Sequence, residues 1–216
     1  MSKTETDAKG IPLTADHPAI GMGIPIWSFY LIFNSVLTSL GLLLVVFVVL
    51  PSDPRAADKI SSLISLGFGW TYLGAWVLKF CQMIIGINLG TARAKSKVRV
   101  PDQHVYQVKG AEGSKLGYVL METEGAHGDF NRAQRALQNL NENLPQFIAM
   151  YLLASYVCPK AVFVCACVFG FGRVMGAIGY TGSAAGRLGG TMIGVLGTSV
   201  IDCVVLRVGI AAIIGR

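Results

Sequence analysis

The sequence contains few charged residues: Asp, Glu, Lys and Arg make up only 14% of its 216 residues. Soluble domains carry about 25%, so a soluble globular domain is excluded. The hydrophobic residues, 53% of the chain, form long runs that indicate an integral membrane protein in contact with the lipid bilayer. In a membrane protein, the formal net charge of +6 indicates basic loops that set the orientation of the chain and contact anionic lipid headgroups. No basic segment has the interleaved aromatic residues of a single-strand nucleic-acid groove, so no nucleic-acid partner is expected.

Motifs for metals, disulfides and export are missing as well. The five cysteines form no C-x-x-C pair and lie in or beside apolar runs, which favours buried free thiols in a reducing compartment. The histidines, His17, His104 and His127, are isolated, so no metal site is expected. The opening MSKTETDAKG mixes acids with lysines and lacks the apolar core of a cleavable signal peptide.

Five stretches are predicted to cross the membrane. A polar tail over 1–25 precedes an uncharged span over 26–50, which at about 1.5 Å per residue can cross a hydrocarbon core of about 30 Å. Trp27 and Tyr30 at its start are typical interfacial aromatics. The remaining spans are expected over about 60–93, 130–158, 161–180 and 188–214. Lys79, inside the second span, must reach the interface, form a pair or face the bundle interior.

The loops predict how the chain is oriented. Arg93, Lys95, Lys97 and Arg99 follow one another closely, which places this segment on the cytosolic side by the positive-inside rule. The amino-terminal tail and the 181–187 turn then share that side, and the carboxyl terminus lies opposite. Residues 101–129, the longer part of the polar loop 94–129, are too many for a plain turn. They are expected to be a lid, a small surface subdomain or a disordered stretch.

A polar stripe opens the third span, in the segment FNRAQRALQNLNENLP at 130–145. Arg132, Arg135, Asn139 and Glu142 recur at spacings of three, four and three, which places them on one helix face. An ionisable group in a bilayer costs roughly 2.5–3.5 kcal/mol on insertion scales. Either the arginines reach the interface beside a structural Asn–Glu pair, or the stripe binds a polar ligand at the mouth of a helical bundle. Pro145 is expected to kink this span.

Glycines recur at four-residue intervals in the last two spans. They form two series, the first of Gly172 and Gly176 and the second of Gly182, Gly186, Gly190 and Gly194. Small residues at this spacing let helix backbones approach closely, so tight packing of these spans is predicted. Arg173, among these glycines, has no clear role, although an ion pair with Asp202 on the next span is conceivable.

Three segments together resemble the MAPEG superfamily, membrane proteins of eicosanoid and glutathione metabolism. They are a helix ending in A-R before basic residues and V-x-x-P, the pattern F-x-x-x-Q-R-A-x-Q-N-x-x-E-x-x-P, and GRVMGAIGYTG at 172–182. Within the superfamily the similarity is greatest to type 3 microsomal glutathione S-transferases. The resemblance implies an all-α fold: an integral membrane four-helix bundle over 60–214 with one additional N-terminal transmembrane helix. It also implies a homotrimer with glutathione bound between protomers near the cytosolic face.

The resemblance further implies the site and the activity. Glutathione contacts would fall on Arg93, Arg135, Asn139, Glu142 and Tyr180, and Arg187 would be the catalytic residue that stabilises the glutathione thiolate. The expected activity is that of a glutathione transferase or peroxidase on lipophilic substrates, in the endoplasmic reticulum or in a mitochondrial or other organelle membrane. Taken singly, Arg187 could meet lipid headgroups, Tyr180 could be an interfacial aromatic, and Arg93 could be one more cytosolic cation.

Departures from the family pattern keep a second function open. Gly176 stands where the family often has a second tyrosine, Asn143 where some members have a tyrosine, and Leu137 where relatives have Gln or His. The span at 26–50 is extra, and it could cover the lipid face of a trimer or occupy the surface where another protomer docks. The alternative is therefore a non-catalytic MAPEG-like scaffold, an accessory subunit of a larger membrane complex or a lipid-binding protein.

Overall fold

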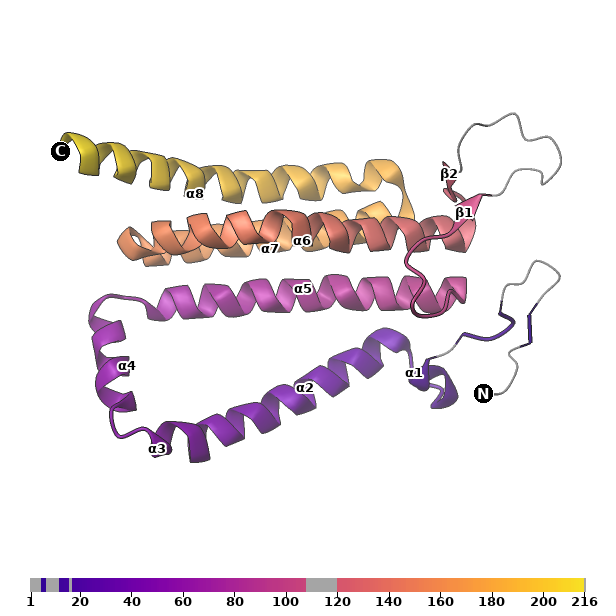
Figure 1. Cartoon of the computed structure of the whole chain (residues 1–216), viewed down its shortest axis with the longest axis horizontal. Helices are drawn as coiled ribbons and strands as arrows, with labels where there is room; N and C mark the ends of the chain where they lie inside the picture. Colours follow the sequence, from indigo (N-terminus) through magenta and orange to yellow (C-terminus); the bar gives the residue numbers. More distant parts are fainter. Residues whose placement is uncertain (1–4, 7–11, 16, 108–119, 216) are drawn as a thin grey trace.

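Long helices lie side by side along one axis of the molecule (Figure 1). The computed structural model describes residues 5–6, 12–15, 17–107 and 120–215. The bundle consists of α5 (Gly69–Ser96), α6 (Gly125–Val157), α7 (Pro159–Gly182) and α8 (Leu188–Ile214). Successive helices run in opposite directions (Figure 1). The predicted all-α membrane bundle with an additional amino-terminal helix is confirmed.

That additional helix leans against the bundle only at its beginning. The short α1 (Pro18–Gly21) leads into α2 (Ile26–Leu44), which continues through the π-helical η1 (Val45–Val49) into α3 (Leu50–Ser52). The ring of Tyr30 packs on Gly90 of α5, and its hydroxyl lies 3.1 Å from Nε2 of His17. Beyond this contact α2 diverges from α5 (Figure 1). None of the residues of α2 is buried.

The second predicted span begins later than expected. Ile60 lies in a separate helix, α4 (Ala56–Ser65), which runs across the direction of the long helices and leads from α3 to the start of α5 (Figure 1). Gly67 ends this helix with φ of +68°, a conformation that glycine adopts without strain. The amide of Gly67 donates to the carbonyl of Ile64, and that of Phe68 donates to Leu63, both at 3.0 Å. This pair of bonds is the Schellman stop signal, and the boundary predicted at 60 overlooked it.

The stripe-bearing helix α6 is the most polar of the long helices. It begins at Gly125 and continues through Pro145 to Val157. Among the described residues, four helices are long and apolar enough to cross a membrane: Ile26–Ser52, Gly69–Ser96, Pro159–Gly182 and Ala184–Ile214. α6 is not one of them, because its charged stripe and its many amide side chains leave too short an apolar stretch. It nevertheless packs inside the bundle, with Ala133, Leu140 and Ala154 buried, and the chain is a multi-pass membrane protein.

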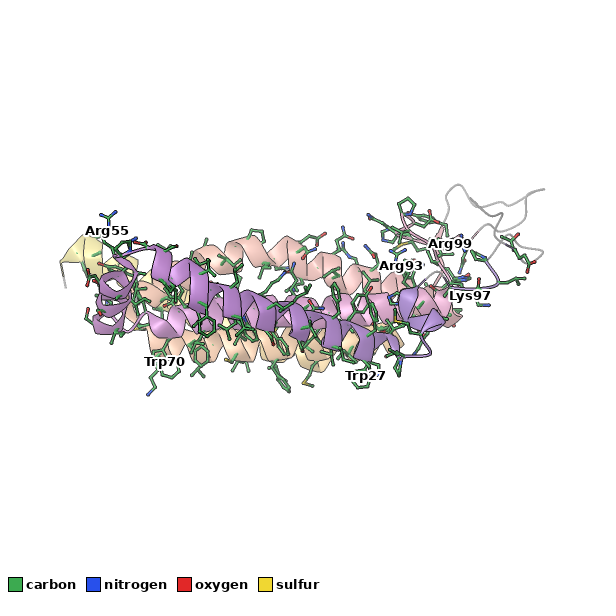
Figure 2. All side chains as sticks on the ribbon, turned by 90° about the horizontal axis from the view of Figure 1, so that it is seen from below. Trp27, Arg55, Trp70, Arg93, Lys97 and Arg99 are labelled. Carbon is green, nitrogen blue, oxygen red and sulfur yellow. The ribbon has the colours of Figure 1, made fainter. Side chains whose placement is uncertain are left out.

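Charged and aromatic side chains mark the two ends of the bundle. Arg93, Lys97 and Arg99 gather at the end where Trp27 lies, whereas Arg55 and Trp70 lie towards the other end (Figure 2). At the basic end, β1 (Tyr106–Gln107) pairs antiparallel with β2 (Leu120–Met121). Residues 108–119 lie outside the described residues. The described part of the polar loop is thus a small surface element at the basic end.

An apolar core joins α6 to its neighbours. The rings of Phe147 and Phe169 stack with centroids 3.8 Å apart. Tyr151 is only 1% exposed, and its hydroxyl donates to the carbonyl of Thr71 at 2.7 Å. These contacts connect α6 to α7 and α5, so the position of the polar stripe is fixed from two sides.

α7 and α8 approach each other backbone to backbone. A methyl group at Gly172 would lie 2.7 Å from the carbonyl oxygen of Gly190 and 2.8 Å from Cα of Gly194. A methyl group at Gly190 would lie 2.5 Å from the carbonyl oxygen of Gly172 and would clash with the amide of Gly176. The predicted close packing is confirmed at these glycines. Gly182 has no neighbour within 4 Å of such a methyl group, so its place in the repeat has no packing role.

This contact generates a prediction with a built-in control. Gly190→Ala should destabilise the protein by about 1–3 kcal/mol, because the backbones of α7 and α8 must separate to admit the methyl group. Gly189→Ala should be neutral or slightly stabilising, since nothing lies within 4 Å of the added methyl and alanine favours a helix. Unfolding in mixed detergent, followed by circular dichroism, measures both. Equal stability of the two variants would contradict the close contact.

Candidate functional site

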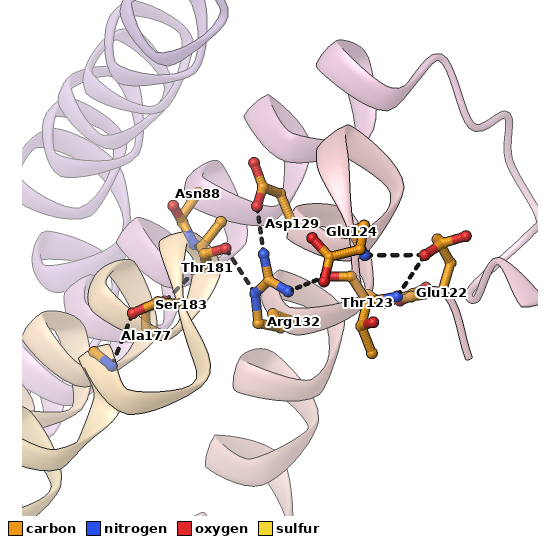
Figure 3. A network of polar contacts seen from close by, with 11 residues as sticks. Asn88, Glu122, Thr123, Glu124, Asp129, Arg132, Ala177, Thr181 and Ser183 are labelled. Atoms are coloured by element: carbon orange, nitrogen blue, oxygen red, sulfur yellow. Dashed lines mark hydrogen bonds and ion pairs between the residues drawn. The ribbon is translucent and has the colours of Figure 1, made fainter. Parts of the chain in front are cut away.

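The polar stripe of α6 divides into a structural part and an exposed part. Arg132 belongs to the structural part, and its side chain is 17% exposed. Its Nε donates to the carbonyl of Thr181 at 3.0 Å, and its Nη1 donates to the carbonyl of Thr123 at 2.7 Å. Its Nη2 forms an ion pair with Asp129, and Figure 3 shows the guanidinium between these partners. Arg132 therefore joins α6 to the end of α7 and is not left for a ligand.

Neighbouring amides extend this structural network. Nδ2 of Asn88 donates to the hydroxyl of Thr181 at 2.8 Å, which adds α5 to the junction (Figure 3). Asn131, 4% exposed, accepts from the amide of Val105 at 2.9 Å and donates to the carbonyls of Val105 and Glu122 at 2.8 Å. The β-hairpin is thereby held against the first turns of α6, and the whole basic end becomes one connected unit.

Arg135 and Glu142 form the exposed part of the stripe. Nη1 of Arg135 donates to Oε1 of Glu142 at 3.0 Å, and the two side chains are 40% and 48% exposed. Glu142 lies ten residues beyond Arg132, or about 15 Å along the helix axis. An exposed ion pair of this kind contributes little stability. The pair can therefore open, and each of the two side chains can bind a charged group of a ligand instead.

Asn139 of the stripe meets Tyr180 and Arg187 at a small cavity. The cavity has a volume of about 50 Å³ and also touches Arg173 and Gly176. The guanidinium carbon of Arg187 lies 5.3 Å from the centre of the Tyr180 ring, within the range of a cation–π interaction. No described residue forms a hydrogen bond with the side-chain amide of Asn139. Its backbone carbonyl accepts from Asn143 at 2.7 Å.

The turn after α7 folds back to bring Arg187 to this position. Ser183 precedes the 3-10 helix η2 (Ala184–Arg187), and its hydroxyl accepts from the amide of Gly186 at 3.1 Å. A methyl group at Gly186 would lie 2.6 Å from the carbonyl carbon of Gly179 and would clash with its oxygen. Because both positions are glycine, the turn can lie against α7, and Arg187 is placed above Tyr180.

Arg173 is a site residue to which the sequence analysis assigned no role. Its Nη2 donates to the carbonyl of Asn139 at 2.8 Å, and its guanidinium carbon lies 5.6 Å from the centre of the Phe169 ring. The conceivable ion pair with Asp202 is wrong: both residues line a cavity of about 330 Å³, but they form no ion pair. Arg173, Gly176 and Tyr180 share one helix face at spacings of three and four, and this spacing could have revealed the residue.

One predicted glutathione contact, Arg93, lies apart from this cluster. Arg93 lies at the same end of the bundle but not at the cavity. Its Nη1 donates to the carbonyls of Asp102 at 2.6 Å and Arg99 at 3.2 Å, and its guanidinium carbon lies 4.8 Å from the Phe130 ring centre. In the single chain Arg93 thus fastens the polar loop.

Gly176, where the family often has a second tyrosine, faces the backbone of the turn. A methyl group at Gly176 would lie 3.5 Å from the carbonyl of Arg187, so this position supplies no hydroxyl to the site.

The division of the stripe predicts that Arg132 and Arg135 contribute unequally to the stability of the protein. Arg132→Ala should lower the free energy of unfolding by roughly 1–3 kcal/mol, because it leaves the partly buried carbonyl of Thr181 without a donor. It should also speed hydrogen exchange in residues 181–187. Arg135→Ala should cost no more than about 1 kcal/mol, since its ion pair is exposed. Thermal unfolding and hydrogen exchange measure the difference, and similar losses in both variants would show that the division is wrong.

Comparison with known proteins gives a family match. A profile of the MAPEG family matches residues 71–202, a range that includes nearly all of α5, the whole of α6, α7 and the 3-10 turn, and about half of α8. No match was found among curated proteins. The matched range covers well over half of the chain and contains every candidate site residue. The chain therefore belongs to the MAPEG family.

Proposed function

We propose that this protein is a membrane-bound glutathione transferase or glutathione-dependent peroxidase. It would activate the glutathione thiolate for attack on lipophilic electrophiles or lipid hydroperoxides. The observation that supports this most strongly is the meeting of Asn139, Tyr180 and Arg187 at one cavity, beside the exposed charges of Arg135 and Glu142. Family membership supports the same class of activity.

The charges at the site match the polar groups of glutathione. Glutathione has two carboxylates, one ammonium and a thiol. The planar guanidinium of Arg135 can bind a carboxylate with two hydrogen bonds, and Glu142 can accept from the ammonium. The side-chain amide of Asn139 offers both a donor and an acceptor to a peptide group. The donor set of the stripe therefore fits the tripeptide.

Arg187 is the residue proposed to activate the thiol. A thiol with an ordinary pKa of about 8.5 is only slightly ionised at neutral pH. A cation in a poorly hydrated site stabilises the thiolate, and each unit by which the pKa falls requires about 1.4 kcal/mol. A fall of two units would make the thiolate the major species. Because glutathione supplies the nucleophile, the protein needs no nucleophilic side chain of its own.

The size of the cavity suggests how the site would be completed. A volume of about 50 Å³ is comparable to one or two water molecules, at about 30 Å³ each, so a tripeptide cannot lie inside it. Glutathione would instead lie across the exposed charges of Arg135 and Glu142, with its thiol towards Arg187. A second copy of the chain would form the other wall, as expected of a homotrimer. The lipophilic substrate would arrive from the bilayer of an intracellular membrane, such as the endoplasmic reticulum.

A non-catalytic role is the second candidate, and two observations favour it. Gly176 faces the backbone of η2 and α8, so the hydroxyl shell around the site is thin. The additional helix α2 lies over part of α5, where it could exclude a second copy of the chain. An accessory subunit of a larger membrane complex would be consistent with both observations.

The first test measures thiolate formation in detergent-purified protein. Addition of glutathione should produce the ultraviolet difference absorbance of a thiolate in the natural protein. Arg187→Ala should abolish this signal, whereas Arg207→Ala should retain it, because Arg207 is exposed near the far end of α8. A thiolate signal in Arg187→Ala equal to that of the natural protein would remove Arg187 from the proposed role. No signal in any variant, together with purification in a larger complex, would favour the accessory subunit.

A further inference from the structure

A further cavity opens between α2 and the bundle, away from the candidate site. It has a volume of about 590 Å³ and is formed by α2, α5 and α6. It exists because α2 touches α5 near Tyr30 and then diverges from it (Figure 1). We call this cavity the α2 groove. Its α6 wall contains Leu137 and Asn141, which lie about 200° around the helix from Arg135 and Asn139.

The α2 wall of the groove is unusually polar for a helix of this type. Asn34, Ser35, Thr38 and Ser39 line the groove, and their spacing places them on one face of α2. Nδ2 of Asn34 donates to the carbonyl of Tyr30 at 2.8 Å. The hydroxyls of Ser35, Thr38 and Ser39 form no hydrogen bond with any described residue. Hydroxyl groups in a bilayer normally form hydrogen bonds across a helix interface. Because these three have no such partner among the described residues, they are available to a ligand.

A cationic side chain faces this polar wall from α5. Lys79 lines the groove, is exposed, and forms no ion pair or hydrogen bond with a described residue. It lies nine residues after Trp70 and fourteen before Arg93, which corresponds to about 14 Å and 21 Å along α5. Both distances exceed the length of a lysine side chain, so its ammonium cannot easily reach either end of the bundle. An ionisable group at such depth usually marks a ligand or a counter-ion.

The groove also has an apolar part next to Lys79. The rings of Trp76 and Phe80 stack at 5.6 Å between centroids, and both line the groove together with Leu31 and Met83. Gln82 donates to Asn141 at 3.4 Å across the α5–α6 wall. A ligand that fits must therefore present one anionic group to Lys79 and a hydrocarbon chain to the aromatic and aliphatic residues.

We propose that the α2 groove binds a fatty acid, with its carboxylate on Lys79 and its acyl chain along Trp76 and Phe80. A single cation beside three hydroxyls matches one small anionic head group, whereas a transmembrane helix would have no charge to place there. The volume lies within the range of about 300–1,000 Å³ for small-molecule pockets. A carboxylate has the single negative charge that Lys79 requires, and the α2 hydroxyls can donate to its second oxygen.

Trp76 provides a reporter for this proposal. The chain has three tryptophans, so Trp27→Phe and Trp70→Phe together leave Trp76 as the only one. Full-length protein in neutral phosphatidylcholine nanodiscs is titrated with nitroxide-labelled stearic acid, and fluorescence quenching of Trp76 is recorded. We expect saturable quenching. The methyl ester of the same labelled acid should give only the unsaturable quenching of free lipid, because it has no charge for Lys79.

Matched lysine variants identify the anchoring charge. Lys79→Gln should weaken binding by about tenfold or more, as expected for loss of a hydrogen bond between charged groups. Lys95→Gln, an exposed lysine on the same helix and outside the groove, should bind like the parent. Saturable binding of the methyl ester, or equal affinity in Lys79→Gln, would overturn the proposal, and the ester comparison does so without any lysine variant. The proposal does not depend on the glutathione site, since thiolate formation should be unaffected in Lys79→Gln.

Discussion

The backbone contact between α7 and α8 determines the geometry on which the candidate site depends. Helices in a membrane gain little from the hydrophobic effect when they associate, so close van der Waals packing has to hold them together. Gly172 and Gly190 permit this closeness, and Gly179 and Gly186 extend it through the turn. Because the turn is pressed against α7, Arg187 lies over Tyr180. A larger residue at these glycines would displace the cation without touching any polar group of the site.

The bundle accommodates the charged residues of α6 because each of them has a partner, either in a hydrogen-bond network or in an exposed ion pair. Arg132 donates from each of its three nitrogens to a group of the same chain, so every nitrogen has a partner although the side chain is largely buried. Arg135 and Glu142 instead neutralise each other while remaining partly exposed. A pair of this kind costs little to open, whereas opening the Arg132 network would detach α6 from the end of α7. One helical stripe thus holds the bundle together and presents exchangeable charges to a ligand.

Long apolar runs and the glycine repeat predicted the bundle, since both are consequences of the lipid bilayer. A membrane-spanning helix must be apolar, and helices in lipid associate through close packing at small residues. The end of α4 at Gly67 was not predicted, because it lies within an apolar run. The helix stops there through two backbone hydrogen bonds, which hydropathy does not indicate. Spacing alone predicted that Arg135, Asn139 and Glu142 share a face, and Arg187 came only from family resemblance. The carbonyl partners of Arg93 and Arg173 depend on how separate segments meet. No local pattern contains that information.

The additional helix α2 changes what the opposite face of α6 can do. Without α2, Lys79 would be an unpaired cation facing lipid, which is costly. With α2 leaning on α5 only near Tyr30, the same lysine faces hydroxyls across a groove of small-molecule size. Leu137 and Asn141 line this groove, whereas Asn139 lines the small cavity of the candidate site. These two cavities therefore share α6 as a wall, and Ile85 adds α5 to the wall of the small cavity. A ligand in one cavity can influence the other by moving one of these helices, and the Arg132 network opposes motion of α6 at the basic end.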